Sequence, residues 1–362
     1  MRLAIVGPRL SGKTTLFNAL TGREASTGPG PEDAVNLGVF QVPDPSLDRL
    51  AALLDIPRVT YVHIEIVDVP GFAGQAGAAP RGLDEKLLHH ARLADALIMV
   101  VRSFQDPTVP TPTGGVDPAA DLGAAWADMV ISDLASAENR LGRLRPLAAK
   151  GGASAEEKVE LEALERIRDE LEEGRGVADT GLSEEEQRLL RGFGFLTAKP
   201  MLVVFNVGEE SLPAAVDPVW EEALGDRGDH ALALCAELAA ELASMEPADA
   251  ETFAGEYGVP AESGREIIRA AYEVLDVVTF YTSVGEKEAR AWTLRRGGTA
   301  LQAAEEVHSD IARGFIKADV VGIDDLLGVG SYTEARKSGL LHQEGKAYLI
   351  QDRDVIHIKF AV

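Results

Sequence analysis

A phosphate-binding loop is the strongest chemical signal in this sequence. The segment GPRLSGKTT, Gly7 to Thr15, matches the pattern G-x-x-x-x-G-K-[ST]. Glycines let such a loop curl, so that its N–H groups and the start of the next helix face phosphate oxygens. A chance match in an ordinary turn is the alternative, but an apolar strand before the loop and an amphipathic helix after it argue against chance. The predicted phosphate contacts are Gly7, Leu10, Ser11, Gly12, Lys13, Thr14 and Thr15.

A second motif, Asp68-x-x-Gly71, ends the apolar segment IEIVDVPG. In P-loop proteins an aspartate at this place holds Mg²⁺, usually through water, and the glycine N–H contacts the γ-phosphate. The pattern alone is weak, since it is a turn in most sequences, but its place downstream of a phosphate loop strengthens it. We therefore predict Lys13, Asp68 and Gly71 as catalytic residues, and Thr14 and Asp68 as Mg²⁺ ligands.

The segment MLVVFNVGEE, residues 201 to 210, stands where guanine-specific proteins carry Asn-Lys-x-Asp. There the aspartate accepts hydrogen bonds from guanine, and the lysine stem covers the base. Here Val207 lacks the charge, and the longer Glu209 shifts the carboxylate, so we expect weak guanine selectivity. The alternative is a strand followed by an acidic loop that binds no base.

These motifs need elements that bring them to one edge of a sheet. Apolar patterns predict strands at 2–7, 37–42, 61–67 and 96–101, and helices at 13–22 and 83–94. The run ALIMVV at 96–101 is typical of a strand buried on both faces of a parallel sheet. Alternating strands and helices predict an α/β fold with a doubly wound sheet.

Helical spacing then replaces this alternation. Residues 118–174 predict an antiparallel helical hairpin, of which a two-stranded coiled coil is one form. Ser183 and Glu186 form a capping box for a helix at 184–192. The α/β pattern resumes at 200–206 and 230–236. A small α+β module follows, with one helix at 299–312 and two strands around the final Asp-Arg-Asp turn. We predict three domains: a nucleotide-binding domain at 1–117 and 197–276, an inserted helical domain at 118–196, and a C-terminal domain at 277–362.

Composition limits the class of protein. The chain has 362 residues, long enough for more than one core, and a net charge of −24, which disfavours broad nucleic-acid binding. Residues 277–362 are nearly balanced, with 11 basic and 12 acidic side chains, so any RNA contact is expected there. One cysteine, no membrane-spanning run and no targeting segment predict a cytoplasmic protein.

With these motifs in order, the chain resembles the YchF/Obg-like ATPases of the translation-factor class of P-loop GTPases. The similar segments are 36–53 (NLGVFQVPDPSLDRLAAL), 182–207, 287–321 (KEARAWTLRRGGTALQAAEEVHSDIARGFIKADVV) and 344–362. The resemblance implies a C-terminal TGS domain with a ubiquitin-like β-grasp, preference for ATP over GTP, Mg²⁺ dependence, and association with ribosomes or ribosomal RNA. It also assigns Asn206, Val207 and Glu209 to the base-recognition motif, and Cys235, Ala236 and Glu237 to a second base-contacting loop.

Three positions depart from the family pattern, and a fourth, Phe72, stands where many GTPases carry the glutamine that orients the attacking water. The usual Asn of the phosphate loop is Leu10, the switch threonine falls near Glu32, and Thr111 stands where the family has a histidine implicated in hydrolysis. Phe72 follows Gly71 and, being apolar, cannot orient an attacking water. We therefore expect slow hydrolysis of ATP or GTP, with fast turnover by the protein alone as the contradicting result.

The sequence is compatible with three functions, which we rank in order. The first is a Mg²⁺-dependent nucleotide hydrolase that acts as a ribosome-associated switch, and the second is a regulatory nucleotide-binding module with little hydrolysis. A small-molecule kinase ranks below both, because the hairpin lacks a lid rich in glycine and arginine. An RNA-binding face on the C-terminal domain would include Lys287, Arg290, Arg295, Arg296 and Lys317.

Overall fold

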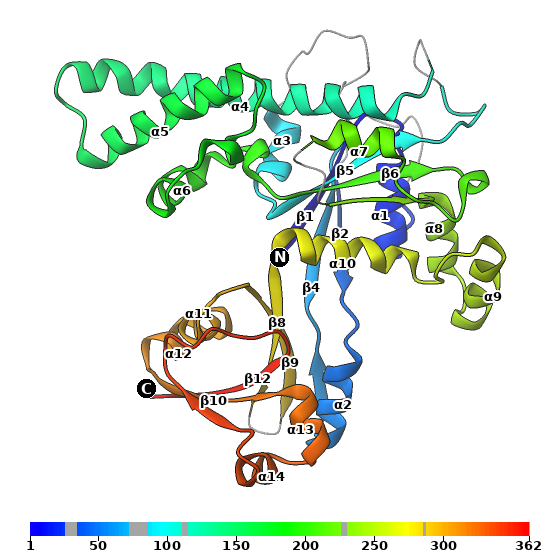
Figure 1. Ribbon diagram of the computed structural model, residues 1–362, viewed down its shortest axis with the longest axis vertical. Coiled ribbons are helices and arrows are strands. Elements are labelled where there is room, and N and C mark those ends of the chain that lie inside the picture. The colour runs from blue at the N-terminus through cyan, green and yellow to red at the C-terminus, as the bar shows by residue number, and fades with distance from the viewer. Residues whose placement is uncertain (26–34, 72–84, 111–114, 226–229, 285–286, 362) are drawn as a thin grey trace. The chain divides into compact units, whose positions relative to one another are not determined.

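The computed structural model describes residues 1–25, 35–71, 85–110, 115–225, 230–284 and 287–361 (Figure 1). The chain divides into two compact units. One unit contains Arg2–Gly38 and Glu65–Val274, and the other contains Met1, Val39–Ile64 and Leu275–Val362. Among the described residues, no helix is both long enough and apolar enough to span a bilayer.

A six-stranded sheet organises the first unit. Its strands lie in the order β2-β4-β1-β5-β6-β7, and every pairing among β4, β1, β5, β6 and β7 is parallel. Their bounds are Asn36–Gln41 for β2, His63–Asp68 for β4, Arg2–Val6 for β1, Ala96–Ser103 for β5, Met201–Val207 for β6 and Ala231–Leu234 for β7. The predicted parallel α/β fold is therefore confirmed. Carboxyl ends of parallel strands meet at one edge, so this sheet brings the predicted motifs together.

Helices α1 (Lys13–Thr21), α3 (Glu85–Arg92), α7 (Pro218–Leu224), α8 (Ala236–Ser244), α9 (Pro247–Tyr257) and α10 (Ser263–Leu275) accompany the sheet. One apolar core joins Val6 and Met99 of the sheet to Leu88 of α3 and Leu224 of α7. Short 3₁₀ turns occupy Val177–Thr180, Arg191–Phe193, Leu196–Ala198 and Glu209–Ser211.

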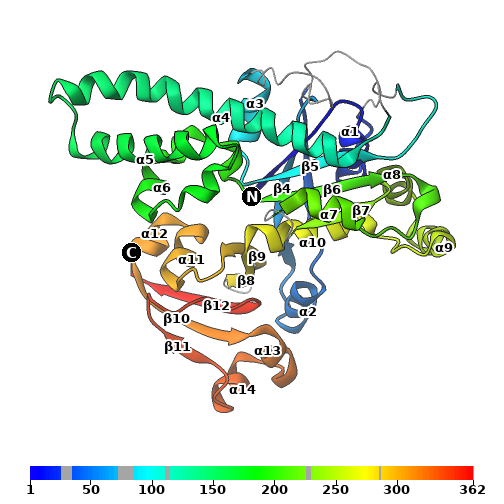
Figure 2. The ribbon, with the colours of Figure 1, turned by 45° about the horizontal axis from the view of Figure 1, so that its top comes forward.

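The predicted helical hairpin is confirmed as α4 (Pro118–Ala149) and α5 (Ala155–Glu172), which run side by side in Figures 1 and 2. The first part of α4 packs on the sheet through Leu122 and Met129, and the second part packs on α5 through Leu141 and Leu144. Helix α6 (Glu184–Leu190) begins with the predicted capping box of Ser183.

A buried ion pair joins α3, α4 and the segment that returns to the sheet. The Asp133 carboxylate is fully buried and accepts hydrogen bonds from Leu196 N at 3.0 Å and Thr197 N at 2.8 Å. Arg92, at the end of α3, lies 3.1 Å from the same carboxylate and also donates to the Ser132 hydroxyl. Helix α4 is therefore tied to the last turn of α3 by charge as well as by apolar packing.

A mixed six-stranded sheet forms the second unit, in the order β11-β10-β12-β8-β9-β3. The strands are β3 (Arg58–Thr60), β8 (Val277–Val284), β9 (Glu288–Arg295), β10 (Phe315–Gly322), β11 (His342–Glu344) and β12 (Asp354–Phe360). Its helices are α2 (Pro45–Leu53), α11 (Ala300–Val307), α12 (Ser309–Arg313), α13 (Ile323–Val329) and α14 (Tyr332–Lys337). The α+β character agrees with the sequence, and the β-grasp topology stays a prediction.

Three details of the second unit differ from the sequence-based expectations. The expected helix at 299–312 is two helices, because His308 adopts an extended backbone and its ring accepts a hydrogen bond from Asp310 N. The expected strand before the Asp-Arg-Asp turn is a single bridge between Leu349 and Thr299. Residues 39–64 group with the C-terminal segment, since β3 pairs with β9. The three predicted domain boundaries otherwise stay a prediction.

Candidate nucleotide-binding site

The phosphate loop connects β1 to α1 and needs glycine at two places. Gly7 has φ of 142°, and a Cβ there would lie 2.3 Å from the Val100 carbonyl oxygen. Gly12 has φ of 94°, and its Cβ would lie 2.1 Å from the Asn206 side-chain nitrogen. A side chain at either position would push the loop away from the sheet. The spacing of the motif thus reflects close approach of backbone to strands β5 and β6.

Lys13 closes back over this loop. Its side chain is only 6% exposed, and Nζ donates to the Pro8 carbonyl at 2.6 Å. Burial lowers the pKa of Lys13 to about 8, although the nearby Asp68 carboxylate opposes the shift. Gly71 lies beside it, since a Cβ on Gly71 would be 2.8 Å from Nζ. Lys13 and Gly71, two of the predicted catalytic residues, therefore meet at the phosphate loop.

The predicted metal ligands are also in contact. The Thr14 hydroxyl donates to Asp68 Oδ2 at 2.8 Å, and Asp68 is 3% exposed. Two hard oxygen donors on adjacent elements fit Mg²⁺, which commonly takes one or two protein ligands and fills its other positions with water and phosphate. The described residues contain no cluster of three or more His, Cys, Asp or Glu side chains that could hold a metal by themselves.

Asn36 is a site residue that the sequence reasoning missed. Its Nδ2 donates to Asp68 Oδ2 at 2.9 Å, the same oxygen that Thr14 contacts. The only sequence signal is a polar residue at the start of a strand. Its contact becomes evident only because β2 and β4 are neighbours in the sheet.

Asn206 ties two loops to the end of β6. Its Nδ2 donates to the Ser11 carbonyl, and its Oδ1 accepts from Ala236 N, both at 2.9 Å. The side chain is 5% exposed. Both polar ends of the amide therefore hold backbone, and a direct contact between Asn206 and a base stays a prediction.

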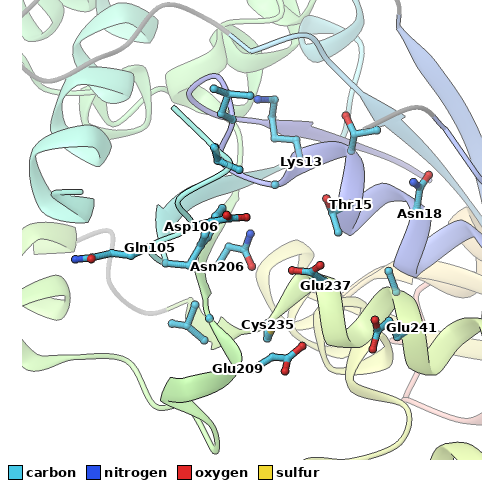
Figure 3. Close-up of a pocket in the computed structure, with 18 of the residues that line it drawn as sticks. Lys13, Thr15, Asn18, Gln105, Asp106, Asn206, Glu209, Cys235, Glu237 and Glu241 are labelled. Carbon is cyan, nitrogen blue, oxygen red and sulfur yellow. The ribbon is translucent and has the colours of Figure 1, made fainter. Parts of the chain in front are cut away.

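A cavity of about 820 Å³ opens beside the phosphate loop (Figure 3), of a size that suits a small-molecule ligand. It is lined by ten of the predicted residues: Leu10, Gly12, Lys13, Thr14, Thr15, Asn206, Val207, Glu209, Cys235 and Glu237. Five others lie outside the lining, namely Gly7, Ser11, Asp68, Gly71 and Ala236. Residues not anticipated also line it: Asn18, Phe104, Gln105, Asp106, Pro107, Val109, Gly208, Glu210, Ala240, Glu241 and Ser244.

The far wall of the cavity is acidic. Glu209, Glu237 and Glu241 are all exposed, and Figure 3 shows them on the side away from Lys13. Glu209 accepts a hydrogen bond from the Tyr257 hydroxyl of α9 at 3.1 Å, which raises the pKa of Tyr257. Burial raises the pKa of the Cys235 thiol, so this cysteine is neutral and packs beneath the wall.

Some predicted residues lie elsewhere. Glu32, Phe72 and Thr111 are outside the described residues. In the second unit, the Arg290 guanidinium stacks on Trp292 at 4.0 Å, and Lys317 donates to Gln343. Of the other predicted RNA contacts, Arg296 pairs with Asp276, whereas Lys287 and Arg295 are exposed.

Two family models match the chain. A model described as a 50S ribosome-binding GTPase matches residues 2–122. The YchF GTPase C-terminal model, described as a protein of unknown function, matches residues 277–361. The first match covers the phosphate loop and Asp68, and the second covers most of the sheet of the second unit.

Full-length relatives carry the same order of segments. The ribosome-binding ATPase YchF of Bacillus subtilis is 34% identical over 365 residues, covering 99% of this chain and 98% of the relative. The protein of that name from Haemophilus ducreyi is 36% identical, covering 100% of this chain and 99% of the relative. The solved structure of the Schizosaccharomyces pombe YchF GTPase is 25% identical, with a TM-score of 0.80, covering 99% of this chain and 97% of that one. The chain therefore belongs to the YchF family.

Proposed function

We propose that this chain binds ATP with Mg²⁺ in the cavity beside the phosphate loop, hydrolyses it slowly, and uses its nucleotide state to control association with ribosomes. The observation that carries the proposal is the cavity, which begins at Lys13 and Thr14 and ends at an acidic wall. Two relatives that match nearly the whole chain are named ribosome-binding ATPases, which supports both the nucleotide and the partner.

Lys13 and the loop backbone supply the grip on the triphosphate. The ammonium of Lys13 exchanges the Pro8 carbonyl for β- and γ-phosphate oxygens, and the loop N–H groups donate to the same chain of phosphates. Gly71 lies next to Lys13, so its N–H is close to the end of the triphosphate. These contacts bind and orient the phosphates irrespective of the base.

Thr14 and Asp68 are the residues that would hold Mg²⁺. Asn36 orients the Asp68 carboxylate by its hydrogen bond to Oδ2. When bound, the ion neutralises negative charge on the β- and γ-phosphates. The neutralisation matters here because Asp106 and the four glutamates that line the cavity repel a free nucleotide tetra-anion.

The acidic wall can accept hydrogen bonds from the exocyclic amine of either purine, so the residues beside it decide the base. Carboxylates of Glu209 and Glu237 accept from the exocyclic amine of adenine, and Val207 offers an apolar surface in place of the lysine of guanine-specific sites. Because Val207 and the longer Glu209 weaken the contacts that select guanine, and because two relatives are named ATPases, binding of ATP in preference to GTP is the proposed selectivity.

Hydrolysis is proposed to be slow because the residue after Gly71 is Phe72, which cannot orient water. The same observation favours a second candidate, a regulatory module that binds nucleotide and hardly cleaves it. Single-turnover ATP cleavage, measured beside ATP affinity, separates the two candidates. Tight binding without cleavage supports the regulatory module.

Paired titrations with ATP and GTP, each with and without Mg²⁺, test the proposal. We expect ATP to bind more tightly than GTP and Mg²⁺ to strengthen both. The variant Lys13→Ala should lose nucleotide binding and nucleotide-dependent cosedimentation with ribosomes, whereas Lys158→Ala, on α5, serves as the matched control. GTP binding about tenfold tighter than ATP, a difference of ~1.4 kcal/mol, would contradict the base assignment.

A further inference from the structure

Arg102 is a buried arginine at the carboxyl end of β5 that no motif accounts for. It is 4% exposed, and its register partner on β6 is Asn206. Burial of a guanidinium costs free energy unless its N–H groups donate hydrogen bonds. The groups that satisfy it therefore show what this residue does.

Within the described residues, the side-chain hydrogen bonds of Arg102 go to the loop that follows its own strand. Nε donates to the Phe104 carbonyl at 3.2 Å, Nη1 to the Pro110 carbonyl at 2.9 Å, and Nη2 to the Val109 carbonyl at 3.5 Å. The guanidinium also lies 4.7 Å from the centre of the Phe104 ring. Burial lowers the pKa of Arg102, and the carboxylates of Asp106 and Asp121 partly offset this effect.

The loop held by Arg102 is a wall of the cavity. Its lining residues are Phe104, Gln105, Asp106, Pro107 and Val109. A turn within the loop adds to its order, because Asp106 Oδ1 accepts from both the backbone N–H and the hydroxyl of Thr108 at 2.7 Å. These hydrogen bonds thus fix the conformation of residues 104–110, which form the wall.

The position of β5 indicates which part of a nucleotide this wall meets. Strand β5 lies between β1, which leads into the phosphate loop, and β6, which leads into the predicted base loop. Residues 104–110 therefore lie next to the nucleoside part of a bound nucleotide. Within the described residues, Lys13 bonds the Pro8 carbonyl and Thr14 bonds Asp68, and neither of these contacts involves Arg102.

We propose that Arg102 is a positioning residue for the nucleoside: it holds residues 104–110 in place as a preformed wall of the cavity. The inference rests on the proposed function, because it assumes that a nucleotide occupies the cavity. A preformed wall strengthens binding, since the loop does not have to be ordered when the ligand arrives. Asn206 does the same for the phosphate loop and for the first residue of α8, so two neighbouring strand ends order two loops and the start of a helix.

Two ligands distinguish this role from a general effect on folding. Wild type, Arg102→Ala and Arg102→Lys are titrated with Mg²⁺ and either ATP or inorganic tripolyphosphate, with Arg140→Ala as the matched control. Arg140 hydrogen-bonds Glu160 on the hairpin and does not line the cavity. We expect Arg102→Ala to weaken ATP binding about tenfold or more and to change tripolyphosphate binding by less than about twofold.

The lysine variant keeps the charge but lacks the fork that spans three carbonyls, so it should also weaken ATP binding. Hydrogen exchange of the peptide containing residues 104–110 should be faster in both variants without ligand. Unchanged ATP affinity, or equal loss for both ligands, would overturn the inference, and the lysine variant decides if the alanine variant does not fold. Failure of wild type to bind either ligand would instead contradict the proposed function.

Discussion

At the scale of single residues, the site combines a buried cation with a buried carboxylate and a half-buried hydroxyl. Lys13, Thr14 and Asp68 are each positioned by a contact inside the protein: the Pro8 carbonyl for the lysine, and the threonine–aspartate hydrogen bond for the other two. Phosphates and metal would replace or join these contacts without a large rearrangement of side chains. The unusual property is the lowered pKa of Lys13. Because of it, the phosphate-binding ammonium loses its proton close to neutral pH.

Nucleotide affinity should therefore depend on pH through Lys13. Its pKa of about 8 lies below the usual value, so the ammonium is mostly charged at pH 7 and mostly neutral at pH 9. Phosphates bind the charged form, and linkage then predicts ATP affinity that falls about tenfold between these pH values. Titrations at a series of pH values measure this change. The variant Lys13→Arg, which does not titrate in this range, should have a flat profile, and a fall of the same size in that variant would exclude Lys13 as its cause.

At the scale of elements, a buried ion pair fixes α3 to the first helix of the hairpin. Residues 72–84, between Gly71 and α3, are outside the described residues, but Arg92 at the other end of α3 holds Asp133 of α4. The Asp133 carboxylate is buried with four donors around it, and burial is the main reason that its pKa is raised. A displacement of α3 would therefore disturb a buried ion pair, and α4 is the element that would respond.

Removal of Asp133 should be costly. Asp133→Ala removes the carboxylate from Arg92 and the acceptor of two backbone N–H groups, and loss of one partner of a buried ion pair costs about 3–5 kcal/mol. The exposed pair of Arg145 and Glu165 is the matched control, since Glu165→Ala should cost less than about 1 kcal/mol. Urea unfolding curves of both variants measure the difference. Equal midpoints for the two variants would show that the buried pair does not stabilise the junction.

At the scale of the whole molecule, charge is unevenly distributed between the part of the chain that would bind nucleotide and the part that would bind RNA. The chain carries a net charge of −24, whereas residues 277–362 are nearly neutral, so the excess negative charge belongs to residues 1–276, which hold the nucleotide site. This distribution opposes the approach of an anionic nucleotide. It also leaves the C-terminal segment as the part of the chain that RNA phosphates can approach at least cost.

Salt should therefore act on the two partners in opposite directions. Between about 50 and about 200 mM salt, association of ATP–Mg²⁺ with the protein should become faster, because screening reduces repulsion, while ribosome binding through RNA phosphates should weaken. Stopped-flow binding of a fluorescent ATP analogue and ribosome cosedimentation measure the two effects. Ribosome binding that does not change with salt would argue against an RNA contact and favour contacts with ribosomal proteins.

The phosphate loop, the parallel α/β sheet and the helical hairpin could be predicted from the amino-acid sequence, because each depends on the spacing of nearby residues: glycine and lysine in the loop, and apolar periodicity in strands and helices. Three features became visible only in the folded chain: Asn36 contacts Asp68, Asn206 and Arg102 order the segments around the cavity, and residues 39–64 group with the C-terminal segment. Most of these contacts join residues from separate strands or segments, and that of Arg102 depends on how a loop folds back on its own strand. Spacing along the chain does not reveal them, because sheet order and burial determine which polar groups meet.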